Sequence, residues 1–155
     1  MKRGIDFEIP NEHGRFLWEV LAPFEMTEFV WTIGHEESYI VEDNALERPL
    51  FPEEKSGMDG LLLRKLLENN MYYLIFANLQ AYPRGEHYER VDTYEEFVNS
   101  HCQLVLLVVD TINVTIYCKD KEKLENLYQQ ADIQGFHHLR YITDKNDSRT
   151  SLSVW

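Results

Sequence analysis

The sequence has few of the residues that mark specialised chemistry. It holds two cysteines, Cys102 and Cys118, with no CxxC spacing, which excludes a disulfide scaffold and a cysteine-only zinc site. Its seven glycines are scattered. They form none of the GxxxxGK[ST], GxGxxG or GxSxG patterns that cradle phosphates, bind dinucleotides or present a nucleophilic serine. No cofactor is therefore expected.

Long apolar runs are also missing. The longest one, Leu104 to Val109, has six residues, whereas a membrane-spanning helix needs about 20. Asp6 and Glu8 interrupt the start of the chain before an apolar segment forms, so no signal peptide is predicted. With two cysteines that we expect to be buried and reduced, the sequence favours a cytoplasmic protein with no membrane partner.

Positive charge is scarce. The 155 residues include 15 Lys and Arg against 27 Asp and Glu, which gives a net charge of −12. Such a surface repels a polyanion, so a nucleic-acid partner is not expected. The apolar content of 44% is ample for a buried core at this length, and residues 1–155 are predicted to form a single globular domain.

Apolar spacing predicts an order of strands and helices with hairpins between them. Strands are expected at 5–9, 72–82, 104–109, 112–118 and 136–143, a hairpin at 28–43, and an edge strand at 152–154; helices at 11–24, 58–70, 93–101 and 120–134; and a long loop at 44–57. The fold class is α+β, with a mixed, mostly antiparallel sheet and about four helices. A ferredoxin-like split βαβ pattern, used twice over one sheet, is one arrangement compatible with this order.

No group of residues stands out as a catalytic or metal site. His35 begins an HExxH-like pattern, but its fifth position is Tyr39 and its context is a hairpin, so no metal ligand set is predicted. An enzyme or small-ligand binder would need a pocket assembled by the fold. The candidate groups for such a pocket are His87, His101, Cys102, His137 and His138.

The acids concentrate in one segment. Between residues 36 and 60 there are eight acids and two bases, a charge of −6. The acids offered as partner-binding residues are Glu36, Glu37, Glu42, Asp43, Glu47, Glu53 and Glu54. An acidic, loop-rich surface can attract a basic protein and speed its association. Ordinary solubilising charge is the alternative explanation.

A second segment, residues 82–90, combines two tyrosines with two arginines. Tyrosine and arginine are enriched where binding energy concentrates in protein interfaces. Tyr82, Arg84 and Tyr88 are therefore further candidates for partner binding. The alternative is that the tyrosines fold back onto the core.

Three segments carry a resemblance to a known family: Met1-Lys2-Arg3-Gly4-Ile5-Asp6-Phe7-Glu8-Ile9-Pro10-Asn11, Trp31-Thr32-Ile33 and Arg149-Thr150-Ser151-Leu152-Ser153-Val154-Trp155. Over essentially its whole length the chain resembles a small family of uncharacterised bacterial proteins, a domain of unknown function. The resemblance implies a bacterial cytosolic origin and assigns no catalytic residue.

Three hypotheses about function remain. The first is a non-enzymatic module that binds a basic protein through its acidic surface, in its most concrete form an immunity-like inhibitor of a basic toxin. The second is an enzyme or small-ligand binder that uses the histidine and cysteine groups. The third is a homo-oligomeric structural protein that pairs through an edge strand at residues 152–155.

Overall fold

The computed structural model describes residues 1–51 and 57–154, with the backbone alone for His35. Within them lie four α-helices and an eight-stranded sheet. The strands are β1 (Lys2–Glu8), β2 (Phe29–Glu42), β3 (Ala45–Pro49), β4 (Met58–Asp59), β5 (Tyr72–Pro83), β6 (Leu104–Val109), β7 (Asn113–Cys118) and β8 (His137–Thr143). The helices are α1 (Phe16–Leu21), α2 (Gly60–Glu68), α3 (Tyr94–Asn99) and α4 (Lys121–Ile133), with the 3₁₀ turn η1 (Met26–Glu28). The predicted α+β class is confirmed.

The strand order is β3-β2-β5-β6-β7-β1-β8, with β4 paired to β2. Every strand pair of the described chain is antiparallel. The split βαβ arrangement occurs twice in this sheet. Helix α2 joins β4 to β5 on either side of β2, and α4 joins β7 to β8 on either side of β1, each outer strand being antiparallel to the strand between them. Between these two units β5, β6 and β7 pair in sequence order.

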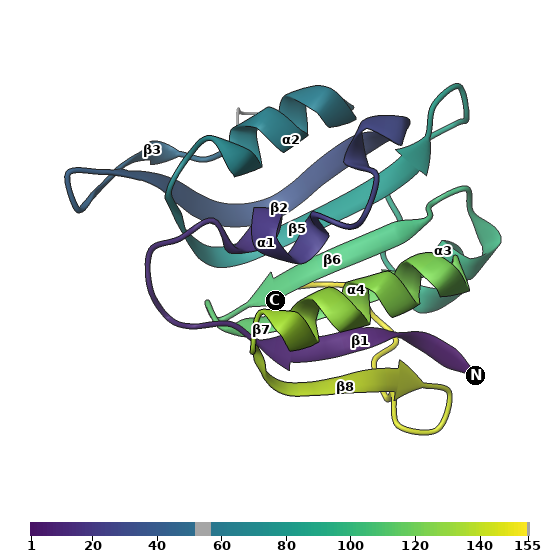
Figure 1. Ribbon diagram of the computed structural model, residues 1–155. Helices are drawn as coiled ribbons and strands as arrows, with labels where there is room; N and C mark the ends of the chain where they lie inside the picture. The colour runs from purple at the N-terminus through teal and green to yellow at the C-terminus, as the bar shows by residue number, and fades with distance from the viewer. Residues whose placement is uncertain (52–56, 155) are drawn as a thin grey trace.

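Helices α1, α2 and α4 cover one face of the sheet, and α3 packs on the other (Figure 1). Strand β6 supplies side chains to both faces, because successive residues of a strand point to opposite sides. Leu104 and Leu106 join the core under α1, α2 and α4, while Val105 and Leu107 join the core under α3. None of the described helices has the length and apolar composition needed to cross a bilayer.

Side chains at several helix ends satisfy backbone amides that the helix leaves without a partner. The Thr93 hydroxyl accepts a hydrogen bond from the Glu96 amide at 3.1 Å, as expected for an N-cap. Asp120 accepts from the amides of Glu122 and Lys123. Gly135 adopts φ +75° just after α4, the left-handed conformation in which glycine commonly ends a helix.

The prediction of a hairpin at 28–43 is wrong. β2 is one strand of fourteen residues, and Gly34 lies inside it, opposite Asn78 of β5. Irregular pairing between Gly34 and Glu37 marks a bulge, which absorbs an extra residue without turning the chain. The real turn is Asp43-Asn44, with φ of 54° and 62°, and the expected loop at 44–57 contains β3 and ends just before β4.

The predicted edge strand at 152–154 is also wrong. Within residues 151–154, Ser151 alone pairs with another strand-like residue, in an isolated bridge to Thr93. Leu152 and Val154 are buried in the core under α3, because the chain after β8 crosses this face instead of extending the sheet. The sheet's outer strands are β3 and β8. Trp155 lies outside the described residues.

Candidate functional site

The acidic segment forms a hairpin at one end of the sheet. We call residues 36–51, on β2, β3 and the residues just after them, the acidic hairpin; it carries five acids and one base. All five residues of β3 are exposed. Figure 1 shows the turn between β2 and β3 extending past the neighbouring strands. Two consecutive residues at positive φ give a tight turn whose twist matches the strands.

The acids of this hairpin differ in exposure. Glu42, Asp43 and Glu47 are exposed, and Glu36 and Glu37 are half-buried. Arg48 Nη1 pairs with Glu42 Oε1 at 2.8 Å, whereas within the described chain Glu37, Asp43 and Glu47 form no ion pair. Glu53 and Glu54 lie outside the described residues. The hairpin therefore presents negative charge that the protein leaves largely unneutralised.

Glu36 differs from the other acids. Its Oε2 atom is buried and has no hydrogen-bond partner among the described residues. Burial raises the pKa of this carboxyl above its usual value, and the neighbouring Glu37 adds to the effect. Glu36 is thus a poor member of a charged recognition surface.

The residues of the tyrosine and arginine loop do not act together. Tyr82 is 1% exposed and its hydroxyl donates to the Glu89 carbonyl oxygen at 2.6 Å, so this tyrosine folds back onto the core, as in the alternative considered for it. Arg84 is at the surface and bonds Asp59 at 2.9 Å and the Thr27 carbonyl at 2.8 Å. Tyr88, 40% exposed, is the tyrosine of this loop that faces solvent.

Two of the five candidate histidine and cysteine groups share a pocket. His87 and His101 both line a cavity of about 340 Å³ beside α3. Nε2 of His87 is 3.5 Å from Glu89, and Nε2 of His101 is 3.6 Å from Glu86. The fold therefore brings two of the candidate histidines to one pocket.

The other three groups lie elsewhere. Cys102 is fully buried, and burial raises the pKa of its thiol to about 12, so it is no nucleophile at neutral pH. His137 and His138 are exposed at the start of β8, and His138 Nδ1 is 2.9 Å from Glu8. Among the described residues no three His, Cys, Asp or Glu side chains converge as metal ligands.

The pocket also contains a residue that the sequence did not single out. Arg90 lines it, and its guanidinium lies against Gly34 and donates to Thr32 Oγ1 at 2.8 Å. Gly34 was the available signal, because a glycine inside a strand often marks the close approach of another group.

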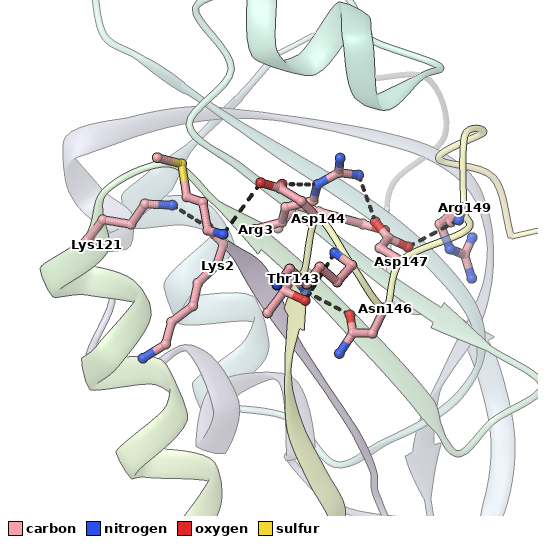
Figure 2. Close-up of polar contacts among 11 residues, drawn as sticks. Lys2, Arg3, Lys121, Thr143, Asp144, Asn146, Asp147 and Arg149 are labelled. Carbon is pink, nitrogen blue, oxygen red and sulfur yellow. Dashed lines mark hydrogen bonds and ion pairs between the residues drawn. The ribbon is translucent and has the colours of Figure 1, made fainter.

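The bases near the chain ends are already engaged in the fold. Figure 2 shows Arg3 between two carboxylates, with Nε 2.8 Å from Asp144 and Nη1 3.3 Å from Asp147. Its guanidinium also stacks 4.1 Å from the Tyr94 ring centre. The Lys121 amine bonds the Lys2 carbonyl. This cluster ties β1 to the segment after β8, so the basic side chains here stabilise the fold.

Together, the sheet, the acidic hairpin and the pocket beside α3 define an α+β protein whose candidate sites lie at its surface. Comparison by sequence then places it: the chain belongs to the family described as "Protein of unknown function (DUF2691)", which matches residues 2–153. It is 43% identical over 154 residues to the Uncharacterized protein YncE of Bacillus subtilis (strain 168), with 99% of this chain and 100% of that protein covered. No solved structure matches it.

Proposed function

We propose that the protein is a non-enzymatic cytosolic module that binds a basic protein through its acidic hairpin. The observation that carries the proposal is the exposure of Glu42, Asp43 and Glu47 on a hairpin that extends past the sheet. Complementary charge of this kind accelerates encounter and excludes partners of the same sign.

The backbone of the hairpin supports the same function. β3 is an outermost strand of the sheet and, within the described residues, pairs on one side with β2 alone. An edge strand offers amide and carbonyl groups to an added strand of a partner. Pro49 ends β3 and limits such pairing to a few residues, so the charges, more than the backbone, select the partner.

A tight turn also favours binding. Because Asp43 and Asn44 hold the turn at positive φ, the acids of the hairpin are placed before a partner arrives. Less conformational entropy is then lost on association. An inhibitor that covers a basic toxin is the most concrete form of this function.

The test is a double charge reversal, Asp43→Lys with Glu47→Lys. The immobilised protein is exposed to Bacillus subtilis lysate, retained proteins are identified, and binding of the purified partner is then measured at 50 and 500 mM salt. We expect a basic protein whose affinity falls at high salt, because salt shortens the distance over which exposed charges attract each other, about 10 Å at 0.1 M. The double variant should lower the affinity at least about tenfold, because it replaces two attracting charges with repelling ones.

The matched control is Glu95→Lys with Asp132→Lys, which makes the same charge change on exposed residues of α3 and α4. We expect this control to keep the partner. The proposal is wrong if no salt-sensitive partner is retained, or if both double variants lose it equally.

A further inference from the structure

Arg90 occupies an unusual position for an arginine. It follows β5 in the chain, and its side chain reaches back across the sheet to β2, where Nη1 donates to Thr32 Oγ1 at 2.8 Å. A Cβ atom added to Gly34 would lie 2.6 Å from Cζ of Arg90 and 2.7 Å from its Nε. The guanidinium therefore lies directly against the Gly34 backbone, and any residue with a side chain at position 34 would displace the guanidinium.

The guanidinium of Arg90 forms no ion pair with a described residue, although the Asp92 carboxylate acts on its charge from farther away. The side chain is partly buried, and burial lowers the pKa of its guanidinium. No carboxylate of the described residues lies within 4.0 Å of it, and Nε and Nη2 have no acceptor there. A partly desolvated cation without a paired carboxylate is unfavourable, so a bound anion would stabilise this arrangement.

The acids nearby are directed to other partners. Glu96 Oε1 accepts from the Asp92 amide at 3.1 Å and from the Thr93 hydroxyl at 3.2 Å, where it helps to cap α3. Glu89 is highly exposed and lies beside the His87 ring. Both line the same cavity as Arg90 without neutralising it.

The cavity has the size of a small-molecule site. Its volume of about 340 Å³ falls in the range of about 300–1,000 Å³ that ligand pockets occupy. Beside Arg90 it is lined by Tyr82, His87, Asn99, Ser100 and His101. Ser100 already bonds the Phe97 carbonyl at 2.9 Å, so Asn99 and the two imidazoles are the side chains best able to hold the rest of a ligand.

We propose that Arg90, seated on Gly34, is the anion-binding residue of a small-molecule site beside α3, and that its ligand carries a carboxylate or a phosphate. The Nε and Nη2 edge of a guanidinium forms two parallel hydrogen bonds with either group. This site is separate from the acidic hairpin and does not depend on the function proposed above.

The experiment is a titration of the ¹⁵N-labelled protein followed by NMR, with inorganic phosphate and malonate as separate probes. We expect saturable shifts of the Arg90 Nε–H signal and of the Thr32 and Gly34 amides. The probe that binds more tightly tells a phosphate ligand from a carboxylate ligand. Chloride at equal ionic strength serves as the blank.

Four variants sharpen the result. Arg90→Gln removes the charge, and Arg90→Lys keeps the charge but loses the two parallel N–H donors of the guanidinium. Gly34→Ala keeps Arg90 but adds a methyl group where the guanidinium lies against the backbone. All three should weaken binding at least about tenfold. Arg84→Gln is the matched control, because Arg84 belongs to the same loop and is already paired with Asp59.

The proposal is overturned if neither probe produces saturable shifts in the wild-type protein, or if Arg84→Gln weakens binding as much as Arg90→Gln. Circular dichroism checks that each variant folds. If Arg90→Gln does not fold, the proposal is tested by the saturable shifts of the wild-type protein and by the loss of binding in Arg90→Lys. The acidic-hairpin variant, Asp43→Lys with Glu47→Lys, should bind the probes unchanged, so the two proposals fail independently.

Discussion

At the scale of single residues, Glu36 makes the clearest prediction. Burial raises the pKa of its carboxyl in the folded state, so the folded protein holds this proton more tightly than the unfolded chain does. Stability is then lost as the pH rises from the unfolded pKa through the folded pKa. Glu36→Gln should raise the free energy of unfolding at pH 7.5 by less than about 1 kcal/mol, since the group is only partly desolvated.

The measurement is urea unfolding of the wild type and the variant at pH 7.5 and at pH 3.5. The advantage of Glu36→Gln should disappear at the lower pH, where both side chains are neutral. Glu37→Gln removes the same charge from the same strand and serves as control. Equal stabilisation by both variants at pH 7.5 would show a general relief of negative charge and no effect of burial.

Residue types alone were a partial guide to the candidate sites. The run of acids indicated exposed charge, and Glu42, Asp43 and Glu47 are exposed, but the sequence did not reveal that Glu36 and Glu37 are half-buried. Tyr82 and Tyr88 were indistinguishable in sequence, yet β5 buries the first while the loop exposes the second. Arg90 was missed because its environment is set by Gly34 and Thr32, which lie 56 and 58 positions away in the chain.

At the scale of elements, the segment after β8 was expected to form an edge strand, but its residues Leu152 and Val154 are buried in the core under α3. Leu152→Ala should therefore cost about 2–4 kcal/mol, the range for a buried leucine truncated in a core. A leucine on an exposed edge would cost much less. Leu61→Ala, which truncates a leucine that is 47% exposed, is the matched control, and chemical unfolding measures both. If Leu152→Ala lowered the free energy of unfolding by less than about 0.5 kcal/mol, the value usual for a surface position, the burial of this segment would be contradicted.

Local periodicity predicted most helices and strands, but it failed where pairing with a strand distant in the sequence determines the structure. The helix and strand spacing at 94–143 predicted α3, β6, β7, α4 and β8 closely. Alternation on either side of Gly34 predicted two strands, because a glycine followed by the polar residues 35–38 resembles a turn. Pairing with β5 on both sides of the bulge keeps β2 continuous, and no local pattern reveals that partner.

At the scale of the whole molecule, the two cores share their strands and should unfold together. Trp31 is buried on the face covered by α1, α2 and α4, and Cys102 is buried on the face covered by α3. In a Cys118→Ser variant, tryptophan fluorescence and thiol labelling of Cys102 should give the same urea midpoint, as two-state unfolding requires. Labelling of Cys102 at lower urea would mean that the α3 face opens by itself.

The fold class was predictable because composition and element order constrain it, whereas the strand order was not. Hairpin neighbours such as β6 and β7 follow from a short turn at Asp110-Thr111. The place of β1 depends on pairing across the full length of the chain, with Gly4 opposite Tyr117 on one side and Ile142 on the other.

That position of β1 has a consequence for synthesis on the ribosome. Strand β1 is the first to leave the exit tunnel, and its hydrogen-bonding partners, β7 and β8, are among the last. Its apolar side chains stay exposed and its backbone lacks its strand partners until more than a hundred further residues have been translated. Closing so long a loop makes such contacts slow to form, so a nascent chain of this protein is the form most exposed to chaperones and to aggregation.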